Sequence, residues 1–112
     1  EFRQLRAYTV NDDGSLGEGA VLHDFGEHRG IDGMRLDTDG NIVATAGWEL
    51  GGLGPSIYIF APDGEILERH DVPCTRPTNC CFGGEDLTNL YVTTIEGHLF
   101  RARTERQGRQ LP

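Results

Sequence analysis

Asp32 is the residue of this chain whose type and position best suit catalysis. It stands in the run Gly30-Ile31-Asp32-Gly33-Met34, directly before a stretch of β type. Where several strands converge, a carboxylate can bind a hard divalent cation, and it can also take a proton from a water molecule whose pKa the cation lowers. The alternative is structural, because Asp often caps the turn before a glycine. Residue type alone leaves both interpretations open.

Three more residues are candidates for the wall of a small-molecule pocket. Trp48 precedes the glycine-rich stretch Gly51–Pro55, which we expect to be a loop, and loops of this kind often carry binding residues. Packing within the fold is the alternative for Trp48. Asn79 begins a β-type run much as Asp32 does, so repetition places either Asn79 or Thr78 at the same face. Turn capping is the alternative for Asn79.

Two other polar clusters do not fit a metal site. The segment Asp37–Asn41 resembles the start of an EF-hand loop, but its glycine comes too early and the twelfth position is Trp48 instead of Glu. We therefore expect a hairpin turn there. His23, Glu27 and His28 lack the spacing of a zinc motif, so we interpret the two histidines as solvated loop residues.

The cysteines indicate reduced thiols packed in the core. There are three, Cys74, Cys80 and Cys81, and no C-x-x-C pattern joins them. Cys80 and Cys81 stand in a strand-like run without a neighbouring base, which favours core packing over nucleophilic chemistry. A bridge between Cys74 and Cys80 is the less favoured alternative.

The composition excludes several function classes. With 112 residues, 18 acidic and 10 basic side chains and a net charge of -8, the chain forms one small acidic domain at most. A negative surface repels phosphate backbones and anionic lipids, so we expect neither nucleic-acid nor membrane binding. All basic residues are Arg, which excludes Schiff-base and P-loop lysines. Ser15 and Ser56 lie outside any Gly-x-Ser-x-Gly pattern, which excludes a nucleophile-elbow hydrolase.

The sequence says little about the compartment. The first residues, Glu1-Phe2-Arg3-Gln4, lack the regions of a secretory signal, so we expect a mature terminus or an interior cut. The apolar runs are far shorter than the roughly 20 residues that span a bilayer. The compartment stays open, with the cytoplasm slightly favoured and the periplasm as the alternative.

Short β-type runs alternate with Gly, Asp and Asn turns along the whole chain, without a helical period of ordinary length. Three Asp-Gly dipeptides separate pairs of runs, and they are hairpin signals because Gly tolerates positive φ. The charges of the sixth run are typical of an exposed edge strand. The sequence predicts nine strands, at Gln4–Val10, Ala20–Phe25, Gly33–Asp37, Ile42–Ala46, Ser56–Phe60, Glu65–Asp71, Asn79–Phe82, Leu90–Thr94 and His98–Arg103.

Two hairpins of the chain are alike. Gly33–Leu36 followed by Ile42–Thr45 aligns with Asn79–Phe82 followed by Leu90–Thr93. A period of roughly 40–50 residues with four strands each is typical of β-propeller blades. The second run of each hairpin is almost continuously apolar, which indicates that neighbouring blades cover both of its faces. Nine strands make just over two blades, so we expect the chain to be part of a larger propeller.

These residues resemble a known family. The runs Gly30–Asp37, Asp39–Ile42, Ile57–Glu65, Pro77–Gly84 and Leu90–Thr94 are similar, in order and spacing, to the C-terminal blades of gluconolactonases of the senescence-marker-protein (regucalcin) type. The combination of Asp-Gly-Met with Cys-Cys-Phe-Gly-Gly makes the resemblance specific, and it covers nearly the whole chain. It implies an all-β fold that is part, just over two blades, of a six-bladed β-propeller.

The resemblance also divides the chain within one propeller domain. Residues 1–28 would be the outer strands of one blade, residues 29–73 a complete blade, and residues 74–112 three strands of the last blade. The fourth strand of the last blade and the remaining blades would come from an upstream segment or from a second chain.

The resemblance implies hydrolysis of small-molecule sugar lactones with a divalent cation at the top of the central channel. Of the three implied protein ligands, a Glu, an Asn and an Asp, only the Asp has a counterpart here, Asp32, as metal ligand and general base. The Glu and the Asn would lie upstream of Glu1, so the chain would act as a lactonase only when the upstream blades complete the ring. Calcium is the expected cation, with zinc, manganese and magnesium as alternatives. The other interpretation is a non-catalytic propeller that binds a small ligand or a protein partner.

Overall fold

The computed structural model describes residues 3–110, and these residues contain nine β-strands and no helix. Accordingly, nothing in this range forms a helix able to cross a bilayer. The prediction of an all-β chain with nine strands in this order is confirmed. The strands are β1 (Gln4–Val10), β2 (Leu16–Asp24), β3 (Ile31–Leu36), β4 (Ile42–Trp48), β5 (Gly51–Phe60), β6 (Ile66–Asp71), β7 (Pro77–Gly83), β8 (Asn89–Thr94) and β9 (Leu99–Arg103).

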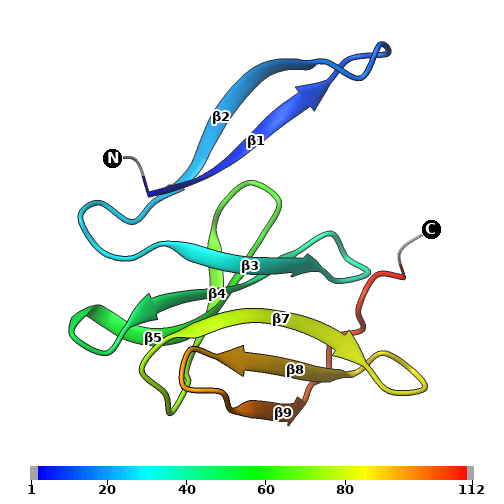
Figure 1. Cartoon of the computed structure of the whole chain (residues 1–112). Coiled ribbons are helices and arrows are strands. Elements are labelled where there is room, and N and C mark those ends of the chain that lie inside the picture. The colour runs from blue at the N-terminus through cyan, green and yellow to red at the C-terminus, as the bar shows by residue number, and fades with distance from the viewer. Residues whose placement is uncertain (1–2, 111–112) are drawn as a thin grey trace.

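The strands form three antiparallel sheets that follow one another along the chain. They are a hairpin β1-β2, a four-stranded sheet β3-β4-β5-β6 and a three-stranded sheet β7-β8-β9. In Figure 1 the hairpin projects from the body that the other two sheets form together. The first strands of those two sheets, β3 and β7, contact each other. The charged strand β6 lies at a sheet edge, as its composition predicted.

Six strands, β2, β3, β4, β5, β7 and β8, are longer than the sequence predicted, and two of them show why. β2 begins at Leu16 instead of Ala20, and its Gly19 pairs with Tyr8, whose ring occupies the space that a Cβ at Gly19 would need. β5 begins at Gly51 instead of Ser56, so the expectation of a loop over 51–55 is wrong. Gly47 allows this hairpin to close, because a Cβ there would lie 2.1 Å from the carbonyl oxygen of Gly54. The glycines therefore serve close backbone approach within strands.

Two apolar clusters cover the two faces of the four-stranded sheet. The cluster toward β7–β9 consists of Val43, Ile57, Ile59, Cys80, Leu90 and Val92. The cluster on the side of the hairpin consists of Leu5, Ala44, Ala46, Tyr58 and Phe60. Because successive strand residues point to opposite faces, consecutive positions of β4 enter different clusters. β4 is thus buried on both faces, as its continuous apolar run predicted.

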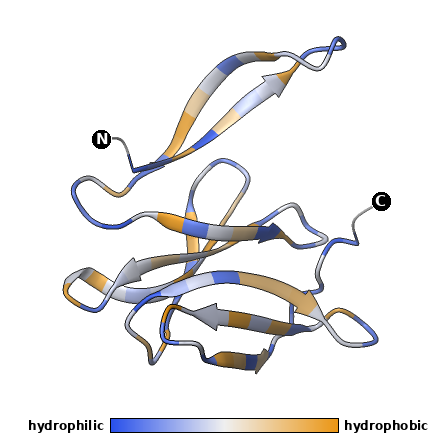
Figure 2. Cartoon of the chain, viewed as in Figure 1, coloured by the Kyte–Doolittle hydropathy of each residue, from blue (hydrophilic) through white to orange (hydrophobic). Residues whose placement is uncertain are grey.

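Within residues 3–110, the sheet β7-β8-β9 is covered on one face, and most of the hairpin β1-β2 is exposed on both faces. On β8, Leu90 and Val92 are buried, whereas Thr93 is exposed. The prediction that this strand is buried on both faces is therefore confirmed for one face only. The hairpin β1-β2 exposes apolar side chains on both of its strands, which Figure 2 shows in orange. In a propeller such faces lie against neighbouring blades. The exposed apolar residues of the hairpin are Tyr8, Val10, Leu16 and Val21.

Asp37 organises the turn between β3 and β4. Its Oδ1 atom accepts hydrogen bonds from the amides of Asp39 and Asn41, both at 2.9 Å. The predicted hairpin turn is therefore confirmed. Asp37 is only 1% exposed, and its Oδ2 atom lies 3.2 Å from Arg106 Nη1. Arg106 also binds Glu68 on β6, and this contact lowers the pKa of Glu68. The C-terminal segment is thus fastened to the four-stranded sheet.

Two of the structural interpretations need correction. His28 is an exposed loop residue as expected, but His23 lies on β2 and packs edge-on against Phe25, with ring centroids 4.5 Å apart. All three cysteines are free. Cys80 is buried as expected, whereas Cys81 is exposed, because adjacent residues of β7 point to opposite faces and one of these faces is uncovered.

Candidate functional site

Asp32 lies at a β-bulge near the start of β3. Ile31 pairs with Ala46 and Gly33 with Thr45, so Asp32 is the extra residue between two consecutive positions of β4. A bulge takes its extra residue out of the ladder and turns its side chain to a new direction, and bulges often lie beside active sites. The sequence placed Asp32 before the strand, and the structure places it inside the strand.

Thr45 closes this bulge from the opposite strand. Its buried hydroxyl accepts a hydrogen bond from the Gly33 amide at 3.1 Å and lies 3.2 Å from the Gly33 carbonyl oxygen, to which it can donate. Gly33 has no room for a side chain, because a Cβ there would lie 2.2 Å from Asn79 Oδ1 on β7. The position of Asp32 is thus fixed both by the hydroxyl of Thr45 and by the contact between β3 and β7.

The Asp32 carboxylate faces two guanidinium groups. Its Oδ2 atom lies 3.5 Å from Arg29 Nη2 and 3.9 Å from Arg76 Nε. Arg29 belongs to the connection between β2 and β3, and Arg76 to the connection between β6 and β7. The Asp32 side chain is 33% exposed, so a ligand can reach it from solvent. Two guanidinium groups around one carboxylate leave a net positive charge at this point.

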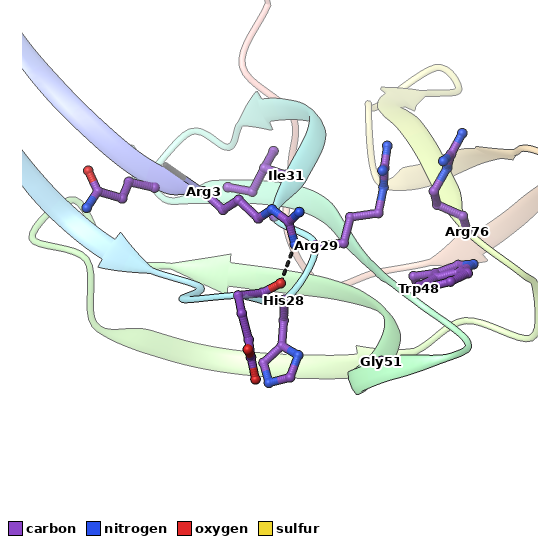
Figure 3. Close-up of a pocket in the computed structure, with 10 residues that line it drawn as sticks. Arg3, His28, Arg29, Ile31, Trp48, Gly51 and Arg76 are labelled. Atoms are coloured by element: carbon purple, nitrogen blue, oxygen red, sulfur yellow. Dashed lines mark hydrogen bonds between the residues drawn. The ribbon is translucent and has the colours of Figure 1, made fainter. Parts of the chain in front are cut away.

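A pocket of about 640 Å³ adjoins this group. Small-molecule sites typically measure about 300–1,000 Å³, so the pocket has the size of a ligand site. In Figure 3 the side chains of Arg29 and Arg76 extend in the same direction, with the Trp48 ring next to the base of Arg76. The pocket is lined by Arg3, Gln4, Glu27, His28, Arg29, Gly30, Ile31, Trp48, Gly51 and Arg76.

Hydrogen bonds between neighbouring connections hold the pocket wall in place. The Glu49 amide at the tip of the β4–β5 hairpin donates to the Thr75 carbonyl oxygen at 2.9 Å. The Thr75 amide donates to Glu96 Oε2 at 2.7 Å, and this bond lowers the pKa of Glu96 to about 2. The Ile95 amide donates to the Arg76 carbonyl oxygen at 2.9 Å. The backbone that carries Arg76 is therefore fixed by the β8–β9 turn.

The predicted site residues fall into two groups. Trp48 lines the pocket and is 41% exposed. Thr78 and Asn79 lie on β7 and do not line it. The Thr78 hydroxyl shares a hydrogen bond of 2.8 Å with the Thr93 hydroxyl, and Asn79 Oδ1 accepts a hydrogen bond from the Cys80 amide. The structure thus brings Trp48 to the arginines that surround Asp32, and it keeps Thr78 and Asn79 on the neighbouring inner strand.

Arg29 and Arg76 were not predicted as residues of the site. Neither belongs to a motif, and they are far apart in the sequence. A signal was nevertheless present, because Arg29 comes three residues before Asp32 and Arg76 two residues before Thr78, so each stands just ahead of one copy of the repeated hairpin. Since both residues precede the first strand of a sheet, the repeat places them at the same end of the molecule.

The residues of this chain fit one part of a divalent-cation site. Asp32 offers a partly exposed carboxylate, the type of oxygen ligand that hard cations prefer. Within residues 3–110, no three His, Cys, Asp or Glu side chains lie close enough together to hold an ion.

Comparison with curated proteins shows relatives that are longer than this chain. It is 35% identical over 92 residues to a 6-deoxy-6-sulfogluconolactonase of Pseudomonas putida, covering 80% of this chain and 30% of that protein. It is 41% identical over 78 residues to a gluconolactonase of Zymomonas mobilis, which covers 69% of this chain and 19% of that protein. It is 32% identical over 83 residues to regucalcin of Danio rerio, which covers 72% of this chain and 26% of that protein. The chain thus spans less than a third of the length of these relatives.

Solved structures agree with these sequence matches. The chain superposes with a TM-score of 0.77 and 28% identity on a structure described as a putative gluconolactonase, covering 97% of this chain and 34% of the other. It superposes with a TM-score of 0.79 and 25% identity on a calcium-binding regucalcin of Agrobacterium tumefaciens, covering 98% and 41%. These matches confirm the predicted fold class, an all-β chain that is part of a propeller. The family described as "SMP-30/Gluconolactonase/LRE-like region" matches residues 2–96, and the chain belongs to it.

Proposed function

We propose that this chain carries part of the catalytic face of a divalent-cation-dependent lactone hydrolase of the gluconolactonase type. The observation that carries the proposal is the position of Asp32, a partly exposed carboxylate at a bulge, beside a pocket of suitable size. Relatives named as gluconolactonases support a lactone hydrolase family. The substrate class is a small sugar lactone.

The order of the three sheets supports the division of the propeller that we propose. The hairpin β1-β2 would supply the outer strands of one blade (residues 1–28), β3–β6 a complete blade (29–73), and β7–β9 three strands of the last blade (74–112). The remaining blades would cover the exposed faces of the hairpin and of β7–β9. They would also supply the other ligands of the cation.

Asp32 would hold the cation on the side of this chain. Calcium is our first choice because an oxygen-only site suits it, and a structural relative is a calcium-binding regucalcin. Zinc, manganese and magnesium are the alternatives. Such an ion would polarise the lactone carbonyl and lower the pKa of a bound water. Arg29 and Arg76 lie 3.5 Å and 3.9 Å from the Asp32 carboxylate, one on each of two connections.

The reaction adds one water molecule to the lactone. The water oxygen forms a bond to the carbonyl carbon, the ring C–O bond breaks, and the product is an open hydroxy acid. Asp32 accepts a proton from the attacking water and returns it to the leaving ring oxygen. Trp48 forms an apolar wall of the pocket and limits the access of other water molecules.

One observation favours a second candidate, a non-catalytic propeller that binds a small ligand on the same face. The Asp32 carboxylate is already balanced by Arg29 and Arg76, as in a structural ion pair. A propeller of this kind would hydrolyse no lactone, with or without the Asp32 carboxylate.

The test is lactone hydrolysis by the complete protein, followed by acid release at constant pH. Asp32→Asn should lower kcat by about 10²–10⁴-fold, the usual contribution of general acid–base catalysis. Asp39→Asn is the matched control, because Asp39 is an exposed turn residue of the same sheet, and it should retain activity. Full activity of Asp32→Asn would contradict the catalytic role of Asp32, and no hydrolysis of any lactone by the unmodified protein would favour the binding propeller.

A further inference from the structure

We propose that the pocket beside Asp32 binds an oxyanionic group of the substrate, a sulfonate, phosphate or carboxylate, through Arg29 and Arg76. The inference rests on the proposed function, because it names the class of lactone that this site accepts. Such a lactone carries a negatively charged substituent in addition to its ring ester.

The charge of the pocket is opposite to that of the chain. The chain has a net charge of -8, yet two arginines of the pocket lining, Arg29 and Arg76, share the single carboxylate of Asp32. Asp32 compensates one of these arginines but does not line the pocket. Because exposed charges are screened beyond about 8 Å at physiological salt, the local excess of guanidinium groups decides what binds here. That excess favours an anion.

The two arginines have hydrogen-bonding capacity that Asp32 does not use. Their distances to Asp32 Oδ2, 3.5 Å and 3.9 Å, exceed the usual N–H···O range of about 2.7–3.2 Å. The Arg76 Nε atom is buried, and no atom of residues 3–110 accepts a hydrogen bond from it. A guanidinium group offers five donors in a planar fork that matches carboxylate, phosphate and sulfonate oxygens. An oxyanion between the two side chains would satisfy these donors.

The site is also preorganised. The carbonyl oxygen of Arg76 accepts a hydrogen bond from Ile95, and the neighbouring Thr75 is bonded to Glu49 and to Glu96. The Trp48 ring provides an apolar wall beside Arg76, which strengthens charged interactions by excluding water (Figure 3). Little ordering of the backbone is then required when an anion binds.

The first experiment measures anion binding without catalysis. Inorganic sulfate and inorganic phosphate are titrated into the complete protein, and the Trp48 signal is isolated as the fluorescence difference from Trp48→Phe. We expect saturable binding that weakens at least tenfold in Arg29→Gln and in Arg76→Gln. Arg109→Gln, an exposed arginine outside the pocket, is the matched control and should bind as the unmodified protein does. Equal affinity in all variants would overturn the proposal.

The second experiment measures specificity. Hydrolysis of a neutral aldonolactone is compared with that of the same lactone carrying a terminal phosphate or sulfonate. Arg76→Gln should raise KM for the charged lactone at least tenfold and leave KM for the neutral lactone within twofold. An equal change for both lactones would contradict an anion subsite. If no lactone is hydrolysed at all, the proposed function fails, and the anion titration still decides the inference.

Discussion

Asp32 and Thr78 occupy the same bulge position at the start of two adjacent strands, β3 and β7. Each is the extra residue opposite a single step of the partner strand, between Ile31 and Gly33 in one case and between Pro77 and Asn79 in the other. Each bulge faces a threonine whose hydroxyl bonds across it, Thr45 in the first sheet and Thr93 in the second. The two strands thus share the β-bulge, whereas the side chain at the bulge differs, Asp in β3 and Thr in β7.

The contact between the two bulged strands predicts a strong effect of Gly33→Ala. A Cβ at this position would lie 2.8 Å from Asn79 Cα, a backbone atom that cannot move aside without shifting β7. We expect a loss of about 1–3 kcal/mol in the free energy of unfolding, as in other overpacked sites. Urea unfolding followed by circular dichroism measures it.

Gly51→Ala is the matched control for this substitution. The nearest atom to a Cβ there is Trp48 Cε3 at 3.9 Å, an ordinary contact. Its effect should stay within about 0.5 kcal/mol. Equal stability of the two variants would contradict the close approach of β3 and β7.

Arg106 is predicted to stabilise the end of the chain. It bonds the buried Asp37 carboxylate and Glu68 at the same time, from a segment without regular structure. Arg106→Gln would leave the Asp37 oxygen with Asn41 Nδ2 as its remaining partner. We expect a loss of about 1–3 kcal/mol in the free energy of unfolding, the range for a buried polar group that loses a partner. A thermal unfolding curve unchanged by this substitution would show that the segment is held in another way.

The two adjacent cysteines should differ in reactivity. Burial raises the pKa of the Cys80 thiol to about 11, so at pH 8 it stays protonated and unreactive, whereas Cys81 is exposed. Iodoacetamide at pH 8 should alkylate Cys81 well before Cys80 in the native chain, and the protection of Cys80 should fall as the pH approaches 11. Peptide mass spectrometry distinguishes the two sites, and equal labelling would contradict the register of β7.

Protonation of Glu96 at acid pH should weaken its hydrogen bond with the Thr75 amide near the pocket. The Thr75 amide lowers the pKa of the Glu96 carboxyl from 4.5 to about 2. A lowered native pKa means that the contact stabilises the fold above the unfolded-state pKa and is lost as the pH falls toward 2. After correction for intrinsic exchange rates, the Thr75 amide hydrogen should therefore exchange faster as the pH is lowered from 4.5 to 2. Glu96→Gln should remove this dependence on pH. A pH-independent protection of Thr75 in the unmodified chain would contradict it.

The sequence predicted the strands well because their signals are local. Alternating apolar residues and Asp-Gly turns determine each hairpin by itself, and the repeat identifies the sheets. The glycine-rich stretch at 51–54 was misinterpreted as a loop, because glycine content indicates an irregular backbone, whereas these residues pair as the start of β5 and Gly47 opposite them allows the close approach. His23 was misinterpreted for a related reason, since only the packed sheets bring Phe25 and Phe60 to its ring.

The candidate site was predictable only in part. Asp32 follows from its motif and from the repeat, but the bulge that directs it depends on pairing with β4, which residue types do not reveal. The arginines at 29 and 76 come together because β3 and β7 lie side by side. Their meeting at one carboxylate is a tertiary property, and no spacing in the sequence encodes it directly.

The most direct test of the account is the affinity of the complete protein for calcium, measured by equilibrium dialysis with Asp32→Asn and with the control Asp39→Asn. The account predicts that one calcium ion binds per protein, that Asp32→Asn weakens this binding by at least tenfold, and that Asp39→Asn leaves it unchanged. Zinc, manganese and magnesium are measured in the same way. Unchanged affinity of Asp32→Asn for every one of these cations would contradict the assignment of Asp32 as a metal ligand.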